Sequence, residues 1–334
     1  MKKIASRTYT HPRRHASGMT LIELMIALLL GLLVVGGAVG IFLSNQQAYR
    51  ATESIGRIQE SARTAFELMV RDVREAGASP CSNEIPIANI LKDARDTDWW
   101  LSWQNGLRGY DGATTAPGTV RKANTDAIDL NFSLDGGIQV IEKMPVSSAN
   151  IEVNTTVGLA DGDIVMICDY ELAGIFQVTQ TPAGLKVQHN TGQGSPGNCT
   201  KGFQYPVECG NADKATWHKY GKNAVIAKMG AVRWYVADNG RGSTSLYRSV
   251  LSNNLGTTLS VNPEEITEGV TDMQLTYLEK AGASYKVATG IPDWENVTAV
   301  RIVITLSGLE RVGTDGQVLT RGIEHVATLR NRLP

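Results

Sequence analysis

The sequence predicts an α+β protein: a long N-terminal helix, transmembrane in its first half and amphipathic in its second, packed on a β-rich globular head. Two observations support this prediction. A single long apolar run lies near the N-terminus and is followed by apolar residues at helical spacing. Beyond it, short apolar runs alternate with Asn, Asp, Gly, Ser and Thr, which is typical of strands joined by turns.

Residues 1–18 form a basic leader without an acidic residue; its cationic and histidine side chains are Lys2, Lys3, Arg7, Arg13, Arg14, His11 and His15. The segment 24–43 that follows has no charged side chain. Its length of about 20 residues corresponds to roughly 30 Å of helix, the thickness of a bilayer's hydrocarbon core. The positive leader predicts a cytoplasmic N-terminus and a translocated body. We therefore expect a transmembrane helix over 19–43.

Three interpretations of this segment compete. A secretory signal peptide has a shorter apolar region, roughly 7–15 residues, followed by an A-x-A-like site, and the residues after 43 offer no such site. A plain membrane anchor explains the length but not Glu23, because an unpaired acid in a lipid-facing helix costs a few kcal/mol. The third interpretation supplies a partner for that acid.

The segment Gly18-Met19-Thr20-Leu21-Ile22-Glu23-Leu24 resembles the type IV prepilin motif. The resemblance implies that prepilin peptidase cleaves after Gly18 and that the new N-terminal residue, Met19, is N-methylated. It also implies that Glu23 pairs with the N-terminal amine of a neighbouring subunit. An ammonium and a carboxylate, each costly alone in a filament core, would neutralise one another there.

Gly36 and Gly40 form a G-x-x-x-G within the apolar run. Small residues allow helices to pack closely in a membrane or a filament core, but glycine is also common in such helices, so both explanations stay open. Major pilins often carry proline where this sequence has Gly40, which disfavours a major pilin.

Helical spacing continues over 44–78, the expected amphipathic half of the helix. Apolar residues recur there at steps of three and four: Ile55, Ile58, Ala62, Ala65, Phe66, Met69, Val73 and Ala76. Gly77 and Pro80 predict the end of the helix.

The head is expected over 79–334. Strands are predicted at 127–132, 164–167, 175–178, 232–237, 246–250, 274–278 and 297–306. Asn239-Gly240 indicates a hairpin between two of them. Residues 81–125 are expected to be irregular, and 189–215 to form a long loop.

The four cysteines predict two disulfides in a head outside the cytoplasm, and no C-x-x-C pair suggests zinc. Four cysteines allow three connectivities. The local pair Cys199–Cys209 is the expected one, which leaves Cys81–Cys168.

Several head segments resemble the PilW family of minor pilins in their order along the chain. They are Gly56-Arg57-Ile58-Gln59-Glu60, Arg63, Arg71-Asp72-Val73-Arg74-Glu75-Ala76-Gly77, Gly162-Asp163, Phe176-Gln177-Val178-Thr179, Ser245-Leu246-Tyr247-Arg248, Glu268-Gly269-Val270 and Leu329-Arg330-Asn331-Arg332.

No catalytic motif is present, so no enzyme activity, cofactor or metal is expected. His189 and His218 are interpreted as solvated side chains. Asp93, Asp96 and Asp98 lack the full pattern of a calcium loop. The tryptophans at 99, 100 and 103 are either a partner-binding patch or core.

The resemblance implies a minor type IV pilin that initiates or caps a pilus. Its expected partners are prepilin peptidase, other minor and major pilins, and the inner-membrane assembly platform. The near-neutral charge of −1 gives no support for nucleic-acid binding. The expected location is the inner membrane, head outward, and then the pilus. The alternatives are a J-like minor pseudopilin of a type II secretion system and a membrane-anchored periplasmic binding protein.

Overall fold

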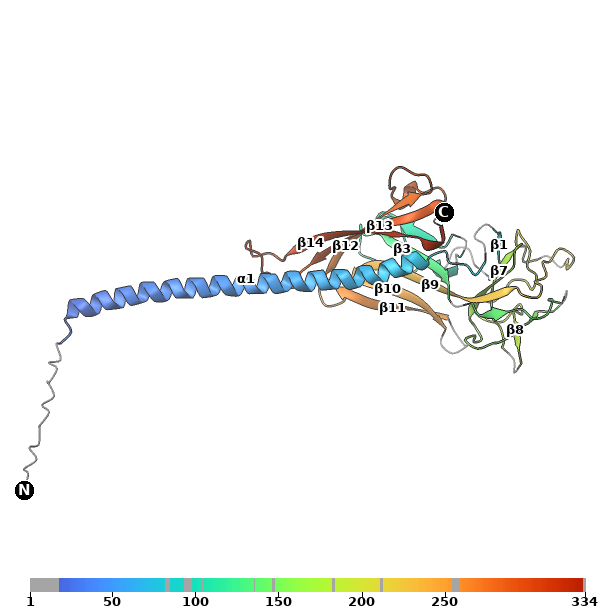
Figure 1. Ribbon diagram of the computed structural model, residues 1–334, viewed down its shortest axis with the longest axis horizontal. Coiled ribbons are helices and arrows are strands. Elements are labelled where there is room, and N and C mark those ends of the chain that lie inside the picture. Colours follow the sequence, from blue (N-terminus) through green and yellow to red (C-terminus); the bar gives the residue numbers. More distant parts are fainter. Residues whose placement is uncertain are drawn as a thin grey trace, which may run out of the picture. The chain divides into compact units, whose positions relative to one another are not determined.

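The computed structural model describes residues 18–81, 85–92, 98–101, 103, 105–134, 136–145, 148–181, 184–210, 213–253 and 259–332. The chain divides into two compact units, Met1–Glu53 and Ser54–Pro334. The long helix α1 (Leu21–Glu75) begins in the first unit and ends in the second. Figure 1 shows the helix and the strands of the head.

Within the second unit, α1 packs on the head through one face. Its buried apolar residues lie at the predicted spacing: Ile58, Ala62, Ala65, Phe66, Met69, Val70 and Val73. The helix ends where Gly77 adopts a φ of +72°, a left-handed conformation that glycine takes without steric cost. The predicted amphipathic helix and its end are confirmed.

Most strands of the head belong to one nine-stranded sheet with the path β1-β7-β6-β9-β10-β11. The strands are β1 (Ile87–Asn89), β2 (Leu107–Tyr110), β3 (Ala127–Ser133), β4 (Ile138–Gln139), β6 (Ile164–Cys168), β7 (Ala173–Gln177), β9 (Val225–Asp238), β10 (Thr244–Asn253) and β11 (Leu259–Glu268). The 14 residues of β9 connect the sheet, because β3, β4, β6 and β10 all pair with it.

Two smaller sheets are also formed by the described residues of the head. One holds β12 (Val270–Glu279), β13 (Val297–Ser307) and β14 (Thr320–Thr328) in that order, all antiparallel. The other pairs β5 (Asn150–Glu152) with β8 (Lys186–Gln188). In the part of the chain that the structure describes, four short 3₁₀ helices lie at η1 (Trp99–Leu101), η2 (Ala288–Gly290), η3 (Trp294–Asn296) and η4 (Arg330–Arg332).

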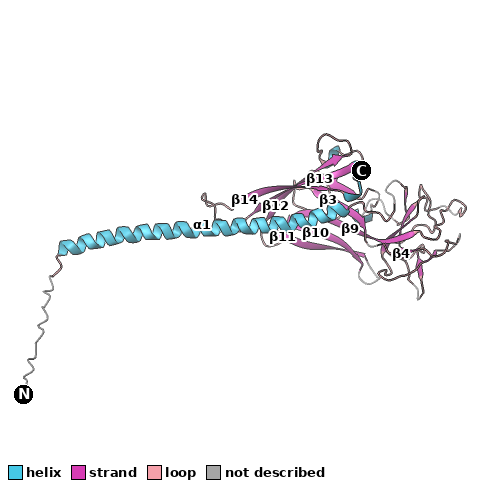
Figure 2. Ribbon diagram, viewed as in Figure 1, coloured by secondary structure: helices cyan, strands magenta, loops and turns pink. Residues whose placement is uncertain are grey.

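The main core joins the end of α1 to two sheets. Apolar side chains of β3 and β9 and of β12 and β13 share one cluster with the buried face of the helix. Figure 2 shows this part of α1 alongside the strands of both sheets. Burying these side chains removes apolar surface from water, which is the main force holding the helix to the head.

The structure confirms every predicted strand and adds several that the sequence did not indicate, among them β11 and β14. The β9–β10 hairpin is confirmed, but its strands are longer and five residues, 239–243, connect them. The segment 189–215 has isolated bridges and no regular strand among its described residues, as expected. The tryptophans are core: the exposed fractions of Trp99, Trp100 and Trp103 are 8% or less.

Candidate assembly site

The N-terminal segment that carries the prepilin motif is described from Gly18 onward. Thr20 caps the helix, since its hydroxyl accepts a hydrogen bond from the amide of Glu23 at 3.3 Å. Glu23 therefore lies in the first turn of α1, where a negative charge interacts favourably with the helix dipole.

The apolar half of α1 exposes its side chains on all sides. All residues from 18 to 50 are exposed, including Leu21, Leu32 and Val34 at above 70%. Among the described residues, α1 is the one helix long and apolar enough to cross a membrane. Gly36 and Gly40 lie on this open surface, with nothing within 4 Å of a Cβ built on either. Neither glycine therefore has a close packing neighbour among the described residues.

The other half of α1 is joined to the head by a buried charge. Asp72 is 1% exposed, and its Oδ2 accepts hydrogen bonds from Trp234 Nε1 at 3.0 Å and Arg248 Nε at 2.7 Å. Arg248 Nη2 also contacts Oδ1, at 3.3 Å. Two segments noted in the sequence, 71–77 and 245–248, thus meet in one ion pair 176 residues apart.

A third such segment, 329–332, meets the same end of α1. The Arg332 guanidinium lies against Gly77, with Nε 3.6 Å from a Cβ built there. It donates hydrogen bonds to the carbonyls of Val297, Trp294 and Asn105. Gly106, at φ +68°, packs so closely that its built Cβ would lie 2.5 Å from Gly77 Cα. The C-terminal residues therefore fix the exit of the chain from the helix.

Two further segments that resemble the family, 162–163 and 176–179, meet at strands β6 and β7 of the large sheet. Gln177 Nε2 donates to the carbonyl of Gly162 at 2.9 Å, and the backbones of Asp163 and Val178 are hydrogen-bonded. Asp163 is buried and forms an ion pair with Lys228 at 2.8 Å. These residues build the strand pair β6–β7.

Both predicted disulfides are present. Cys81 is bonded to Cys168 and Cys199 to Cys209, with Cα atoms 6.2 and 5.1 Å apart. The first attaches the chain just beyond the helix end to β6, and the second closes the loop that follows β8. The pairing is the one expected from the sequence.

Comparison with protein families gives two matches. Residues 233–326 match the family described as type IV pilus-assembly protein W, PilW, and residues 13–39 match the prokaryotic N-terminal methylation motif. Over these two segments the chain is similar to the PilW family and to proteins that carry the N-terminal methylation motif. No curated protein and no solved structure gives a significant match.

The PilW match covers the strands around the helix–head junction. It begins at Arg233 in β9, includes β10 to β13 and ends at Val326 in β14. Both Trp234 and Arg248, the partners of Asp72, lie within it. This match supports a structural role in pilus assembly.

The interpretation of His189 as a solvated side chain is wrong, and His218 is half-buried, with 18% of its side chain exposed. His189 is fully buried, and this burial lowers its pKa from 6.5 to about 4. Its Nε2 contacts the Lys201 carbonyl at 3.1 Å, and its ring packs 5.1 Å from Phe203. His218 Nε2 lies 2.7 Å from Asp169 Oδ2. Both histidines belong to an aromatic cluster that no pattern in the sequence indicated.

Buried ionisable groups of the head contribute to its packing. Arg233, fully buried, pairs with Asp129 and stacks 4.7 Å over Trp99. In the part of the chain that the structure describes, no three His, Cys, Asp or Glu side chains are placed to hold a metal. Asp98 is described, whereas Asp93 and Asp96 lie outside the described residues.

Proposed function

We propose that this protein is a minor type IV pilin of the PilW family that takes part in pilus assembly at the filament tip. The observation that carries the proposal is the methylation motif on a fully exposed apolar helix whose other half is held by a PilW-type head. Prepilin peptidase cleaves between Gly18 and Met19, and Met19 becomes the N-methylated N-terminus.

The chain is organised as a leader over 1–18, a membrane and filament-core helix over 19–43, its amphipathic continuation over 44–78 and a head over 79–334. The N-terminus lies in the cytoplasm and the head in the periplasm, where its cysteines oxidise. From the inner membrane the protein passes into the pilus, in contact with other pilins and the assembly platform.

Glu23 is the assembly contact of the helix. Its carboxylate pairs with the Met19 amine of a neighbouring subunit, which relieves two desolvated charges at once. Gly36 and Gly40 offer a close-packing surface to neighbouring helices. A head of this size is easier to place once, at a tip, than at every position of a filament.

The decisive experiment is mass spectrometry of the mature N-terminus. We expect a mature chain that begins with methylated Met19 in cells with an active peptidase, and unprocessed precursor in cells without it. Gly18→Leu should block cleavage. Intact precursor at steady state in the wild-type strain would reject the proposal and favour a membrane-anchored periplasmic protein.

The pilus is favoured over a type II secretion system because the matching family is described as a pilus-assembly protein. Deletion of the gene separates the two: we expect loss of surface pili with secretion unchanged. The reverse result would identify a minor pseudopilin.

A further inference from the structure

The outer edge of β14 is open to solvent. β14 is the last strand of its sheet, and in the described chain no strand pairs with its other side. Antiparallel pairs alternate in hydrogen bonding, and Leu329 N bonds to Thr298 O. With the register of β13 and β14, this alternation leaves the N–H and C=O groups of Thr320, Gly322, Glu324, Val326 and Thr328 directed outward.

This edge carries few of the features that usually prevent pairing, and its charged side chains are Arg321 and Glu324. Its nine residues contain no proline and no lysine, and its register with β13 has no bulge. Gly322, Glu324 and Thr328, three of the residues with outward backbone groups, line a groove of about 1440 Å³. The unpaired backbone therefore opens into a cavity large enough for another chain.

The opposite wall of the groove is α1. The helix contributes Gln59, Arg63, Glu67, Arg71 and Arg74, which are all exposed. Deeper in the groove lie Phe66 and Val70, each less than 10% exposed, with Ile323 of β14 on the facing side. The floor is thus apolar, while the walls offer hydrogen bonds and charge.

The charges of the groove are unbalanced. Five arginines and three glutamates line it. Arg63 is paired with Glu67 at 2.8 Å, and Glu324 with Arg301 at 3.3 Å. The side chains of Arg74, Arg321 and Arg330 have no hydrogen bond or ion pair to any described residue, and Glu75 is the one unpaired acid. The surplus is positive.

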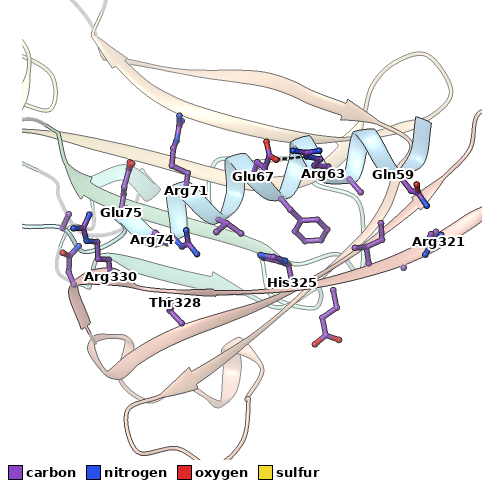
Figure 3. A pocket seen from close by; sticks show the side chains of 18 residues that line it. Gln59, Arg63, Glu67, Arg71, Arg74, Glu75, Arg321, His325, Thr328 and Arg330 are labelled. Atoms are coloured by element: carbon purple, nitrogen blue, oxygen red, sulfur yellow. Dashed lines mark hydrogen bonds and ion pairs between the residues drawn. The ribbon is translucent and has the colours of Figure 1, made fainter. Parts of the chain in front are cut away.

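Figure 3 shows how these charges are distributed. Arg321 lies beside Gln59 at one end of the groove, Arg74 and Arg330 lie at the other end, and His325 lies between them. The His325 ring is 5.6 Å from the Phe66 ring, which marks the apolar centre. A matching ligand carries acids at both ends and an apolar residue in the middle.

We propose that the groove between α1 and β14 binds an extended, acidic segment of a partner protein, which adds to β14 as a fourth strand. Main-chain hydrogen bonds to the outward groups of β14 supply affinity, as in other cases of strand addition. The arginines select acidic side chains, and an apolar side chain packs on Phe66. In the proposed pilus, the partner is another component of the tip.

The test uses the full chain in detergent and a labelled peptide, Glu-Thr-Glu-Thr-Val-Thr-Glu-Thr-Glu, observed by fluorescence anisotropy. Alternate residues of this probe place the acids and the valine on the face toward α1. We expect saturable binding that weakens with salt, and at least a tenfold loss when lysine replaces every glutamate. Hydrogen exchange of the Gly322, Glu324 and Val326 amides should slow in the complex.

Three variants locate the binding. Arg321→Glu and Arg330→Glu should each weaken it at least threefold. Val326→Pro removes an outward N–H but no bond to β13, so it should abolish binding and keep the melting temperature. If Val326→Pro fails to fold, Thr320→Pro, at the first residue of the strand, is tested in its place. Lys222→Glu, an exposed charge change outside the groove, should bind like wild type.

Absence of binding, equal binding of the lysine peptide, or binding unaffected by these variants would overturn the proposal. Self-association of the purified chain that the same variants abolish would assign the groove to a second copy and also overturn it. The assay uses purified protein and does not require leader cleavage or Glu23, so its failure is distinct from a failure of the proposed pilus function.

Discussion

The carboxylate of Asp72 is buried, yet it stays compatible with folding because two partners satisfy it. A buried ion is expensive unless it is paired and hydrogen-bonded. The Arg248 guanidinium supplies the charge and the Trp234 indole N–H an additional donor. These contacts fix the position of Asp72 in α1 relative to β9 and β10, which carry Trp234 and Arg248.

Asp72→Ala should lower the free energy of unfolding by about 3–5 kcal/mol, because it leaves the Arg248 charge without its buried partner. Urea denaturation of the full chain in detergent measures the change. Glu67→Ala is the matched control on the same helix. Its partner Arg63 is exposed, so it should cost less than about 1 kcal/mol. Equal effects of both variants would contradict this account.

His189 gives the head a dependence on pH. Its folded pKa of about 4 lies below its ordinary value of 6.5, so between these values the unfolded chain binds more protons. The stability that the neutral, buried ring contributes is complete above pH 6.5 and is lost as pH falls toward 4. The loss corresponds to roughly 3 kcal/mol.

His189→Gln removes this titration but keeps a donor for the Lys201 carbonyl. Burial raises the pKa of Asp126 to about 6, so this carboxyl group binds a proton more readily in the folded state. Its contribution to the free energy of unfolding therefore increases as pH falls, which is opposite to the effect of His189. The informative quantity is therefore the difference between wild type and variant in urea unfolding at pH 7 and pH 4.5. This difference should shrink or reverse at the lower pH. His325→Gln, at an exposed histidine of β14, should follow wild type at both pH values.

At the scale of elements, the end of α1 depends on two glycines in contact. Gly77 and Gly106 both have positive φ, and their backbones touch. A side chain at Gly106 would have to displace the helix end together with the Arg332 guanidinium. The requirement for glycine here is steric as well as conformational.

Gly106→Ala should destabilise the protein by about 2–4 kcal/mol, combining a left-handed alanine with overpacking. Gly242→Ala is the control, since Gly242 has φ +81° but open space around its built Cβ. The conformational cost alone, about 1–2 kcal/mol, is expected there. Thermal melting of both variants tests the contact, and equal losses would show that it has no energetic weight.

Central strands are easier to predict from this sequence than edge strands. Residues 297–306 alternate because β13 is central, with one face on the core: Val300, Ile302 and Ile304 are fully buried. β14 and β11 are edge strands with most residues exposed or half-buried, so they have no alternation to detect, and Pro263 in β11 argues against a strand. For the same reason, the groove beside β14 could not be predicted.

The junction was partly visible in the sequence. The segments that hold Asp72, Arg248 and Arg332 were noted because they resemble one family, but nothing in their spacing shows that they meet. Their convergence depends on pairings across 176 residues and more. The burial of His189 likewise depends on Phe203 and Phe176, which come from separate segments of the head.

At the scale of the whole molecule, the exposed apolar half of α1 needs a membrane or a filament around it. Among the described residues 18–43, Glu23 is the one with a charged side chain. We expect Glu23→Ala to leave head folding and leader cleavage intact while reducing incorporation into pili, because the Met19 amine of a neighbour loses its partner.

The measurement counts sheared surface filaments, and this protein within them, at equal membrane levels of wild type and variant. Glu53→Ala, an acid of the same helix beyond the apolar run, is the control and should assemble normally. Unchanged filaments in Glu23→Ala would make a plain anchor the better interpretation of the helix. A subunit at the proposed tip has no neighbour ahead of it, so the expected loss is smaller than for a subunit within the filament.

The disulfide between Cys81 and Cys168 also decides how the head responds to mechanical force. In the proposed filament, tension pulls on the head through α1, and Cys81 is the sixth residue after the helix end. Tension that frays the chain past Gly77 reaches the covalent bond almost at once and passes directly to β6 in the large sheet. The chain between the two cysteines, which are 87 positions apart in the sequence, corresponds to roughly 290 Å when extended and is thereby shielded from unravelling.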